Sequence, residues 1–137
     1  MQTEISEFVT RFAAAWSRRS GDAFLELWHP DGVLHSPLYG RPVRGDEFKA
    51  LTELIVSTAP DQVWQLLDWT WRPTARGAVV VIEWQSTRVV GGKRFDWRGV
   101  DKLTLVEGKI AEETVYFDSA PLRALRTGEK LAPLVAF

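Results

Sequence analysis

One carboxylate on the apolar face of a predicted strand is the best candidate for acid–base chemistry in this sequence. Between residues 95 and 105 every second residue is apolar or glycine, with Asp101 the one exception. Side chains alternate between the two faces of a strand, so Asp101 is expected to face the core. Burial raises a carboxyl pKa unless a cation or several donors compensate, and raised values are typical of proton-transfer sites. Asp101 is therefore a candidate general acid or base; a structural Asp that bonds backbone amides or a basic side chain is the alternative.

His35 is the second candidate, and it is one of 2 histidines in the chain. Imidazole titrates near neutral pH and can act as a base. His35 and Ser36 are neighbours on a predicted strand, so only one of them can point inward. His29 precedes Pro30 in a predicted turn. Two histidines and acidic residues at no recognisable spacing predict no metal site.

Composition excludes several classes of function. The 137 residues predict one domain, residues 1–137, and 17 basic against 18 acidic residues give a net charge of -1. Without a basic stripe, neither nucleic acid nor a membrane surface is expected as a partner. The absence of cysteine excludes disulfides and thiolate chemistry. With no signal-like N-terminus and no apolar run of about 18 residues, we expect a soluble cytoplasmic protein.

Three helices are predicted in the first 60 residues. Apolar residues at helical spacing between positions 5 and 16 indicate a first helix that ends near residues 20–21. Asp22 can cap a short second helix that ends before Pro30, and Asp46 can cap a third helix that ends before Pro60. A short strand over residues 33–37 is expected between the second and third helices.

From residue 61 onward the pattern is that of strands. Segments 62–72, 78–90, 94–106 and 109–117 are rich in Trp, Val, Thr and Ile, and turn residues separate them. They predict a meander of four long antiparallel strands, followed by a short helix that Ser119 caps and Gly128 ends. Helices that precede a curved antiparallel sheet predict an α+β fold, with the helices on one face of the sheet.

The tryptophans and the C-terminal tail suggest contacts beyond this core. Regular alternation sends Trp69 and Trp71 to one side of their strand and Trp64 to the other. One Trp-bearing face would then lack a covering helix, which predicts a homodimer through the sheet. The tail is expected to dock on the domain or on a partner subunit, because it carries the apolar residues Leu131, Leu134, Val135 and Phe137.

Several short motifs occur in the order seen in a known family. They are residues 12–16 (Phe-Ala-Ala-Ala-Trp), Gly21-Asp22 with Leu27-Trp28, residues 32–37 (Gly-Val-Leu-His-Ser-Pro), Gly45, residues 108–110 (Gly-Lys-Ile) and residues 115–118 (Val-Tyr-Phe-Asp). Over roughly residues 5–126 the chain resembles the NTF2-like superfamily, and within it the SnoaL-like polyketide cyclases. The resemblance implies a cone of three N-terminal helices on a curved sheet, usually dimeric, with a small-molecule pocket in its mouth. Members include ketosteroid isomerases, polyketide cyclases, limonene epoxide hydrolases and dehydratases.

Only some of the site residues of these relatives have a counterpart of the same type in this sequence. Ser36 stands where the ketosteroid isomerases have their proton-shuttling Asp, and Phe12 stands where they have a Tyr. Asp101, in the context Val-Asp-Lys-Leu, matches their second, protonated Asp. The Arg-x-Asp pair of the epoxide hydrolases has no counterpart in residues 82–86. The resemblance to the cyclases implies an acid–base Asp, which Asp101 or Asp118 could supply.

Two functions stay open at this point. The first is a cofactor-independent isomerase, cyclase or lyase that acts on a small hydrophobic carbonyl compound, with Asp101 and His35 as catalytic groups. The second is a non-catalytic ligand-binding or dimerisation module. In either case the residues expected to contact the ligand are Phe12, Trp16, Ser36, Tyr39, Trp84, Trp97, Tyr116 and Asp118.

Overall fold

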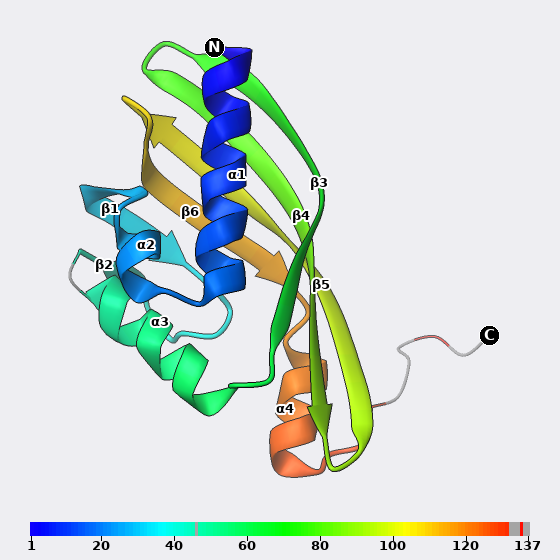
Figure 1. Cartoon of the computed structure of the whole chain (residues 1–137). Helices are drawn as coiled ribbons and strands as arrows, with labels where there is room; N and C mark the ends of the chain where they lie inside the picture. Colours follow the sequence, from blue (N-terminus) through cyan, green and yellow to red (C-terminus); the bar gives the residue numbers. More distant parts are fainter. Residues whose placement is uncertain (46, 132–134, 136–137) are drawn as a thin grey trace.

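The chain folds into helices packed on a curved sheet, as the sequence predicts. The computed structural model describes residues 1–45, 47–131 and 135. The elements (Figure 1) are α1 (Gln2–Arg18), α2 (Gly21–Leu25), β1 (Trp28–His35), β2 (Val43–Arg44), α3 (Glu47–Thr58), β3 (Val63–Thr74), β4 (Gly77–Val90), β5 (Lys93–Val106), β6 (Lys109–Phe117) and α4 (Ala120–Thr127).

The strands form one 6-stranded sheet in the order β2-β1-β6-β5-β4-β3. Strands β3 to β6 are the predicted antiparallel meander, and Gly91 and Gly92 form the β4–β5 turn with φ of 57° and 78°, angles that glycine adopts readily. The sheet is nevertheless mixed rather than wholly antiparallel, because β1 pairs with β6 in parallel. These two strands are separated by α3 and the rest of the meander, and so long a connection permits the parallel pairing.

Strand β1 begins earlier than predicted. It starts at Trp28 rather than at residue 33, and Pro30 lies inside it where the pairing with β6 shifts register between Trp28 and Val33. A strand accepts proline where its ladder of hydrogen bonds is interrupted. Gly32 allows the strand to fold closely over the Trp28 ring, because a Cβ atom at residue 32 would lie 2.5 Å from Trp28 Cε3.

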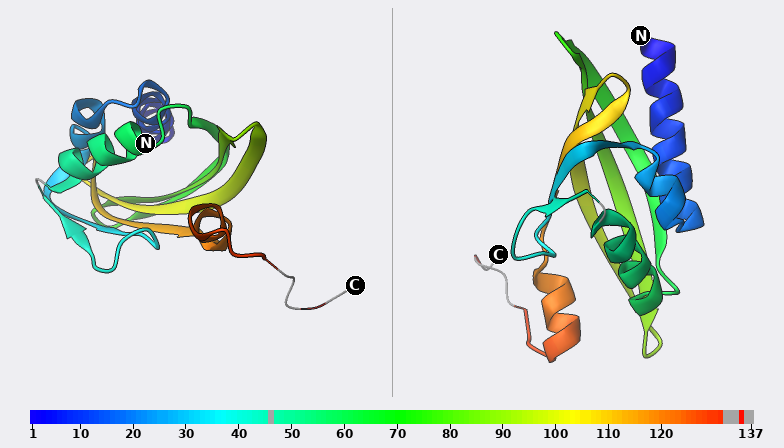
Figure 2. Two further views of the ribbon diagram at one scale, coloured as in Figure 1. Left: turned by 90° about the horizontal axis from the view of Figure 1, so that it is seen from below. Right: turned by 90° about the vertical axis from the view of Figure 1, so that its left-hand side faces the viewer.

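Helices α1, α2 and α3 cover the concave side of the sheet, and α4 lies beside the far end of the β4–β5 hairpin (Figure 2). The buried stripe of α1 packs on the inner faces of the strands and consists of Ile5, Phe8, Val9, Phe12 and Ala15. None of the helices in the described part of the chain has the length and apolar character needed to cross a membrane.

The helix caps differ in detail from the prediction. Ser20, rather than Asp22, caps α2, because its Oγ accepts a hydrogen bond from the Ala23 amide at 3.2 Å. The Asp22 carboxylate instead pairs with Lys49 Nζ at 2.8 Å. Gly128 ends α4 in the left-handed conformation, as expected. Asp46, the expected cap of the third helix, lies outside the described residues.

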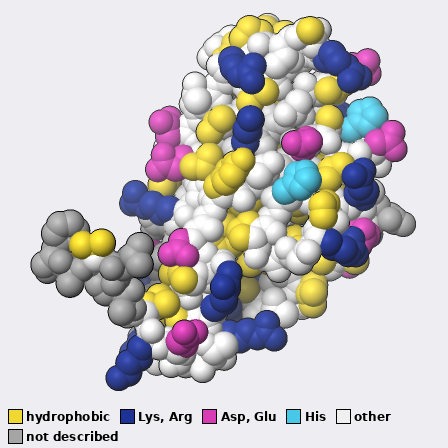
Figure 3. Space-filling view, turned by 180° about the vertical axis from the view of Figure 1, so that it is seen from behind, with side chains coloured by type: hydrophobic (Ala, Val, Ile, Leu, Met, Phe, Trp, Pro, Cys, Tyr) yellow, Lys and Arg dark blue, Asp and Glu magenta, His cyan; other side chains and the backbone are white. Residues whose placement is uncertain are grey.

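A bulge in β3 overturns the expected separation of the tryptophans. The register skips one residue between Leu66 and Asp68, so Trp64, Trp69 and Trp71 all face the helices and the core. A bulge adds one residue to one strand and thereby reverses the alternation beyond it. The outer face of the sheet carries hydrophobic side chains scattered between charged ones (Figure 3). These three tryptophans therefore give no support to a dimer through the sheet, and the homodimer stays a prediction.

The tail is only partly described. Leu134 and Phe137 lie outside the described residues. Leu131 and Val135 are exposed. Docking of the tail thus stays a prediction.

Candidate functional site

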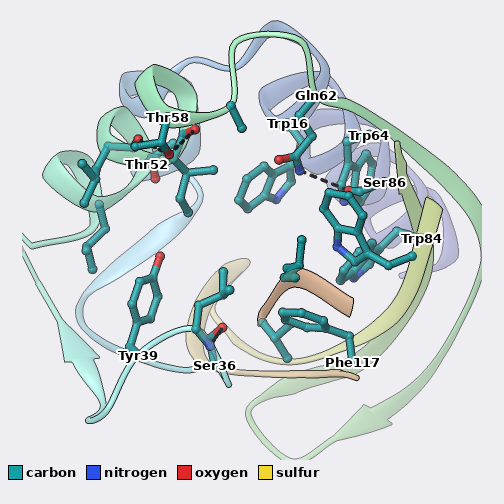
Figure 4. Close-up of a pocket in the computed structure, with 18 of the residues that line it drawn as sticks. Trp16, Ser36, Tyr39, Thr52, Thr58, Gln62, Trp64, Trp84, Ser86 and Phe117 are labelled. Atoms are coloured by element: carbon teal, nitrogen blue, oxygen red, sulfur yellow. Dashed lines mark hydrogen bonds between the residues drawn. The ribbon is translucent and has the colours of Figure 1, made fainter. Parts of the chain in front are cut away.

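A cavity of about 800 Å³ lies between the helices and the concave face of the sheet (Figure 4). Its wall is largely apolar and aromatic, with contributions from α1, α3, α4, the loop after β1 and the inner faces of β4, β5 and β6. Such a volume suits an organic molecule of moderate size. The few polar groups in this wall therefore decide what the cavity can do.

Two carboxylic acids face one another in the wall of this cavity. Asp101 on β5 is 3% exposed, and Glu113 on β6 is 1% exposed. Asp101 pairs in register with Val115, and Leu103 pairs with Glu113, which makes the two acids diagonal neighbours on the inner face of the sheet. Their carboxyl groups are close enough for each to change the pKa of the other. We call Asp101 and Glu113 the acid pair.

The pKa values of both acids in the pair are raised. Burial raises the pKa of Asp101 to about 6, against the opposing effect of hydrogen bonds from Glu113 and from Trp84. Trp84 Nε1 donates to Asp101 Oδ1 at 2.9 Å. Burial and the adjacent Asp101 charge raise the pKa of Glu113 well above its usual range. Glu113 therefore holds its proton to higher pH than a solvent-exposed glutamate does, and its Oε2 has no hydrogen-bond partner among the described residues.

Gly99 fixes the position of the Trp84 donor. The two residues are register partners on β4 and β5, and the indole lies against the bare Gly99 backbone. A Cβ atom at residue 99 would lie 2.3 Å from Trp84 Cζ2. Glycine at this position thus allows the indole to lie flat on the sheet and to reach Asp101.

Tyr39 supplies a third polar group to the cavity. It lies in the loop between β1 and β2, on the wall opposite the tryptophans (Figure 4). Burial and then the nearby Glu113 carboxyl raise the pKa of the Tyr39 hydroxyl, so it stays protonated and can donate a hydrogen bond. Ser36 also lines the cavity, and its Oγ accepts from the Leu38 amide at 3.2 Å.

The structure brings together most of the residues singled out from the sequence. Those that line the cavity are Trp16, Ser36, Tyr39, Trp84, Trp97 and Asp101. Phe12 does not line it; it lies in the core behind the wall, 6.0 Å from Trp64 between ring centroids.

Strand parity corrects the positions expected for three other residues. Leu34 lines the cavity, so its neighbour His35 faces the outer side of the sheet, paired with Thr114. Tyr116 is 58% exposed on that same outer side. Asp118 lies beyond the end of β6, where its Oδ1 accepts from the Ala120 amide at 2.9 Å at the start of α4. None of the three is part of the cavity wall.

Glu113 was missed by the sequence reading. The register between β5 and β6 skips Ala111, so Ile110 and Glu113 both face inward although their numbers differ in parity. This bulge hides the alternation of β6 when the strand is followed from its start. Followed backward from Phe117 through Val115, the inward set ends at a lone acid among apolar residues. That is the same signal that identified Asp101.

The described residues contain no group of three or more His, Cys, Asp or Glu side chains that could hold a metal ion. The acid pair offers two carboxyl groups, with aromatic rather than ligating neighbours.

Comparisons with known proteins agree with this arrangement. The family model of the SnoaL-like domain matches residues 9–113. Among solved structures, AclR, a proposed hydroxylase from Streptomyces galilaeus, is similar with TM-score 0.74 and 20% identity over 98% of this chain and 87% of that one. A proposed SnoaL-like polyketide cyclase from Jannaschia sp. CCS1 gives TM-score 0.71 and 18% identity over 89% and 90% of the two chains.

An NTF2-like protein of unknown function from Burkholderia pseudomallei gives TM-score 0.73 and 17% identity over 90% and 98% of the chains. No curated protein matches the sequence. At these identities the similar structures show the fold, and the family rests on the match over residues 9–113. The chain belongs to the family of SnoaL-like domains.

Proposed function

We propose that this domain binds a small, largely apolar carbonyl compound and moves a proton at the carbon next to the carbonyl. The observation that carries this proposal is the acid pair. It consists of two buried carboxyl groups with raised pKa values, side by side in the wall of an aromatic cavity of about 800 Å³. A base and an acid in contact can remove a proton at one atom and stabilise the charge that develops at another.

The step assigns one role to each group. The Asp101 carboxylate takes the proton, the C–H bond breaks, and its electron pair moves onto the carbonyl oxygen as an enolate. The Tyr39 hydroxyl is a donor for that oxygen, and Glu113 becomes a second donor once Asp101 carries the transferred proton and no longer accepts from Glu113. Return of the proton to another carbon gives an isomer, attack of the enolate on a second carbonyl closes a ring, and loss of a leaving group gives a lyase.

The electrostatics of the pair suit this step. With a pKa of about 6, Asp101 is ionised at neutral pH and is still basic enough to accept a proton. Glu113 stays neutral beside it, so the buried pair carries a single negative charge. Trp84 orients the base through its hydrogen bond to Asp101 Oδ1.

A second candidate is a binding module without catalysis. Asp101 accepts hydrogen bonds from both Glu113 and Trp84, which is how a purely structural acid would also be satisfied. Ser36, which stands at the position of the isomerase base, accepts a hydrogen bond from the Leu38 amide within its own loop. In that reading the acid pair orients a ligand and transfers no proton.

Exchange of carbon-bound hydrogen separates the two. 2-Tetralone in D₂O at pH 7 serves as the probe, with deuterium incorporation next to its carbonyl followed by proton NMR. We expect the wild-type protein to accelerate exchange over buffer, and Asp101→Asn to remove the acceleration. If tryptophan fluorescence shows that the ketone binds while exchange equals that in buffer, the binding module is the correct reading.

We also propose that two copies associate through the outer face of the sheet. Exposed apolar side chains on strands β3 and β6, Leu67 and Tyr116, support a contact there. Light scattering that returns the 15.5 kDa mass of one chain at micromolar concentration would contradict a dimer.

We propose in addition that the protein is located in the cytoplasm, which cell fractionation tests.

A further inference from the structure

We propose that the cavity contains a second polar subsite, built by Gln62, Ser86 and Trp16, that binds an oxygen atom at the far end of an elongated ligand. This inference deepens the proposed function, because it uses the same cavity and defines the shape of its ligand. It concerns binding only, so it can be tested without turnover.

The three side chains form a connected group on one wall. Gln62 Nε2 donates to Ser86 Oγ at 3.2 Å, and Ser86 is 1% exposed on the inner face of β4 (Figure 4). Ser86 pairs in register with Trp64 on β3. The Trp64 ring stacks on the ring of Trp16, with centroids 6.4 Å apart. All of these residues line the cavity.

This group has hydrogen-bonding capacity that the described residues leave unused. Trp16 Nε1 is buried and has no partner among them. Gln62 Nε2 donates one hydrogen bond to Ser86 Oγ, and Gln62 Oε1 forms no hydrogen bond with a described residue. A buried donor without an acceptor destabilises a protein, so a hydrogen-bond partner is expected at such an atom. A ligand hydroxyl fits both groups, because its oxygen can accept from Trp16 Nε1 and its hydrogen can be donated to Gln62 Oε1.

The register sets the distance between this subsite and the acid pair. On β5, Asp101 lies opposite Ile82 and Trp97 lies opposite Ser86. Asp101 and Trp97 are four residues apart on one strand, so the two polar ends of the cavity are separated by about 13 Å. The wall between them includes the Trp84 ring, which lies over the Gly99 backbone.

The geometry therefore points to a flat, apolar ligand with one oxygen at the acid pair and a second oxygen near Gln62 and Ser86. A molecule with a single oxygen would leave one polar end of the cavity unpaired. The chemical class is that of elongated aromatic or polycyclic compounds oxygenated at both ends.

Two rigid probes test the subsite. 4,4′-Dihydroxystilbene carries an oxygen at each end of an apolar rod of about this length, and 4-hydroxystilbene lacks one of them. Their dissociation constants are measured by quenching of tryptophan fluorescence. In the wild-type protein we expect the dihydroxy probe to bind roughly tenfold more tightly, the usual effect of one well-placed hydrogen bond.

Variants locate the source of that difference. Gln62→Leu should reduce the ratio of the two dissociation constants to about one, and Trp16→Phe, which keeps the ring and removes the N–H, should reduce it in part. Thr58→Val is the matched control. Thr58 also lines the cavity, but its hydroxyl is bonded to the Leu54 carbonyl at 2.9 Å, so the wild-type ratio should persist. Ser86→Ala provides a second test if thermal melting shows that Gln62→Leu does not fold.

Three results would overturn the subsite: no binding of 4,4′-dihydroxystilbene to the wild-type protein, no gain from the second hydroxyl, or a gain that survives in both Gln62→Leu and Ser86→Ala. None of them bears on the exchange of 2-tetralone, which uses the acid pair alone. Conversely, a normal stilbene ratio in a protein without exchange activity would retain the subsite and refute the proton transfer.

Discussion

Strand β5 carries two aspartates, Asp96 and Asp101, whose surroundings differ completely. They are five residues apart, an odd number, so they project from opposite faces of the sheet. Asp96 is exposed on the outer face, where Thr87 Oγ1 donates to it at 2.6 Å and Arg94 Nε at 3.1 Å. Asp101 is buried on the inner face, beside Trp84 and a second acid.

The pKa values of the two groups move in opposite directions. Hydrogen bonds from Thr87 and Arg94 hold the pKa of Asp96 below its usual value, whereas burial raises that of Asp101 to about 6. The side chain and the strand are the same, so the difference comes from solvent and neighbours alone. Near neutral pH only the inner aspartate is poised to exchange a proton.

Removing each carboxylate in turn should produce the largest contrast. Asp101→Asn is expected to lower the rate of deuterium exchange into 2-tetralone by roughly 10²- to 10⁴-fold, because the general base is lost. Asp96→Asn should leave the rate unchanged. An equal decrease in the exchange rate in both variants would show that the loss of exchange does not depend on a carboxylate in the cavity.

The same pair of variants should differ in how stability depends on pH. Folded Asp101 binds its proton more tightly than the unfolded chain, so its contribution to stability is present at low pH. This contribution is lost as pH rises from 3.8, the usual pKa of an aspartate, to about 6. The loss is at most about 3 kcal/mol, and Asp101→Asn should remove it.

The pKa of Asp96 is lowered, so its contribution is lost as pH falls, and Asp96→Asn should flatten the acid side of the curve instead. Urea unfolding between pH 3 and pH 8 measures both effects. Parallel curves for wild type and Asp101→Asn would contradict the burial of an ionisable group at this position.

Gly99→Ala should affect Asp101 indirectly, through the Trp84 ring that lies on Gly99. The added methyl group would displace the Trp84 ring and weaken its hydrogen bond to Asp101, at a cost of about 1–3 kcal/mol in unfolding free energy. Gly92→Ala makes a useful comparison, because its Cβ would meet nothing and its cost arises from φ of 78° alone. Unaltered indole fluorescence and stability in Gly99→Ala would refute the close packing.

The smallest effect is expected for Trp84→Phe. It removes one donor to the Asp101 carboxylate while it keeps an aromatic ring, so the midpoint of the pH–rate profile should move upward. A midpoint that stays in place would mean that the indole N–H does not stabilise the charged form.

Regular alternation was enough to predict Asp101 on the inner face, the long strands and their turns. It failed wherever a strand contains an extra residue. The bulge near Leu67 reverses the expected side of Trp64, and the bulge at Ala111 conceals Glu113. Bulges depend on pairing between distant segments, which a local pattern does not contain.

The same limit explains the error at β1 and the misplacement of His35. The sequence placed a strand at residues 33–37 with only one of His35 and Ser36 facing inward, and the resemblance favoured Ser36, but the pattern did not reveal that this strand pairs in parallel with β6. The acid pair likewise arises only when β5 and β6 are brought into register. The sequence pattern identified Asp101, whereas Glu113 is recognised only from the pairing of β5 with β6.

The most direct test is a carbon-13 NMR titration of the aspartate carboxyl groups. We expect the Asp101 signal to titrate with a midpoint near pH 6 and the Asp96 signal to titrate below 3.8, its usual value. Glu113→Gln should alter the Asp101 midpoint, because each carboxyl group shifts the pKa of the other. An Asp101 carboxyl that titrates at or below 3.8, or whose midpoint is the same in Glu113→Gln as in the wild-type protein, would contradict a buried acid pair.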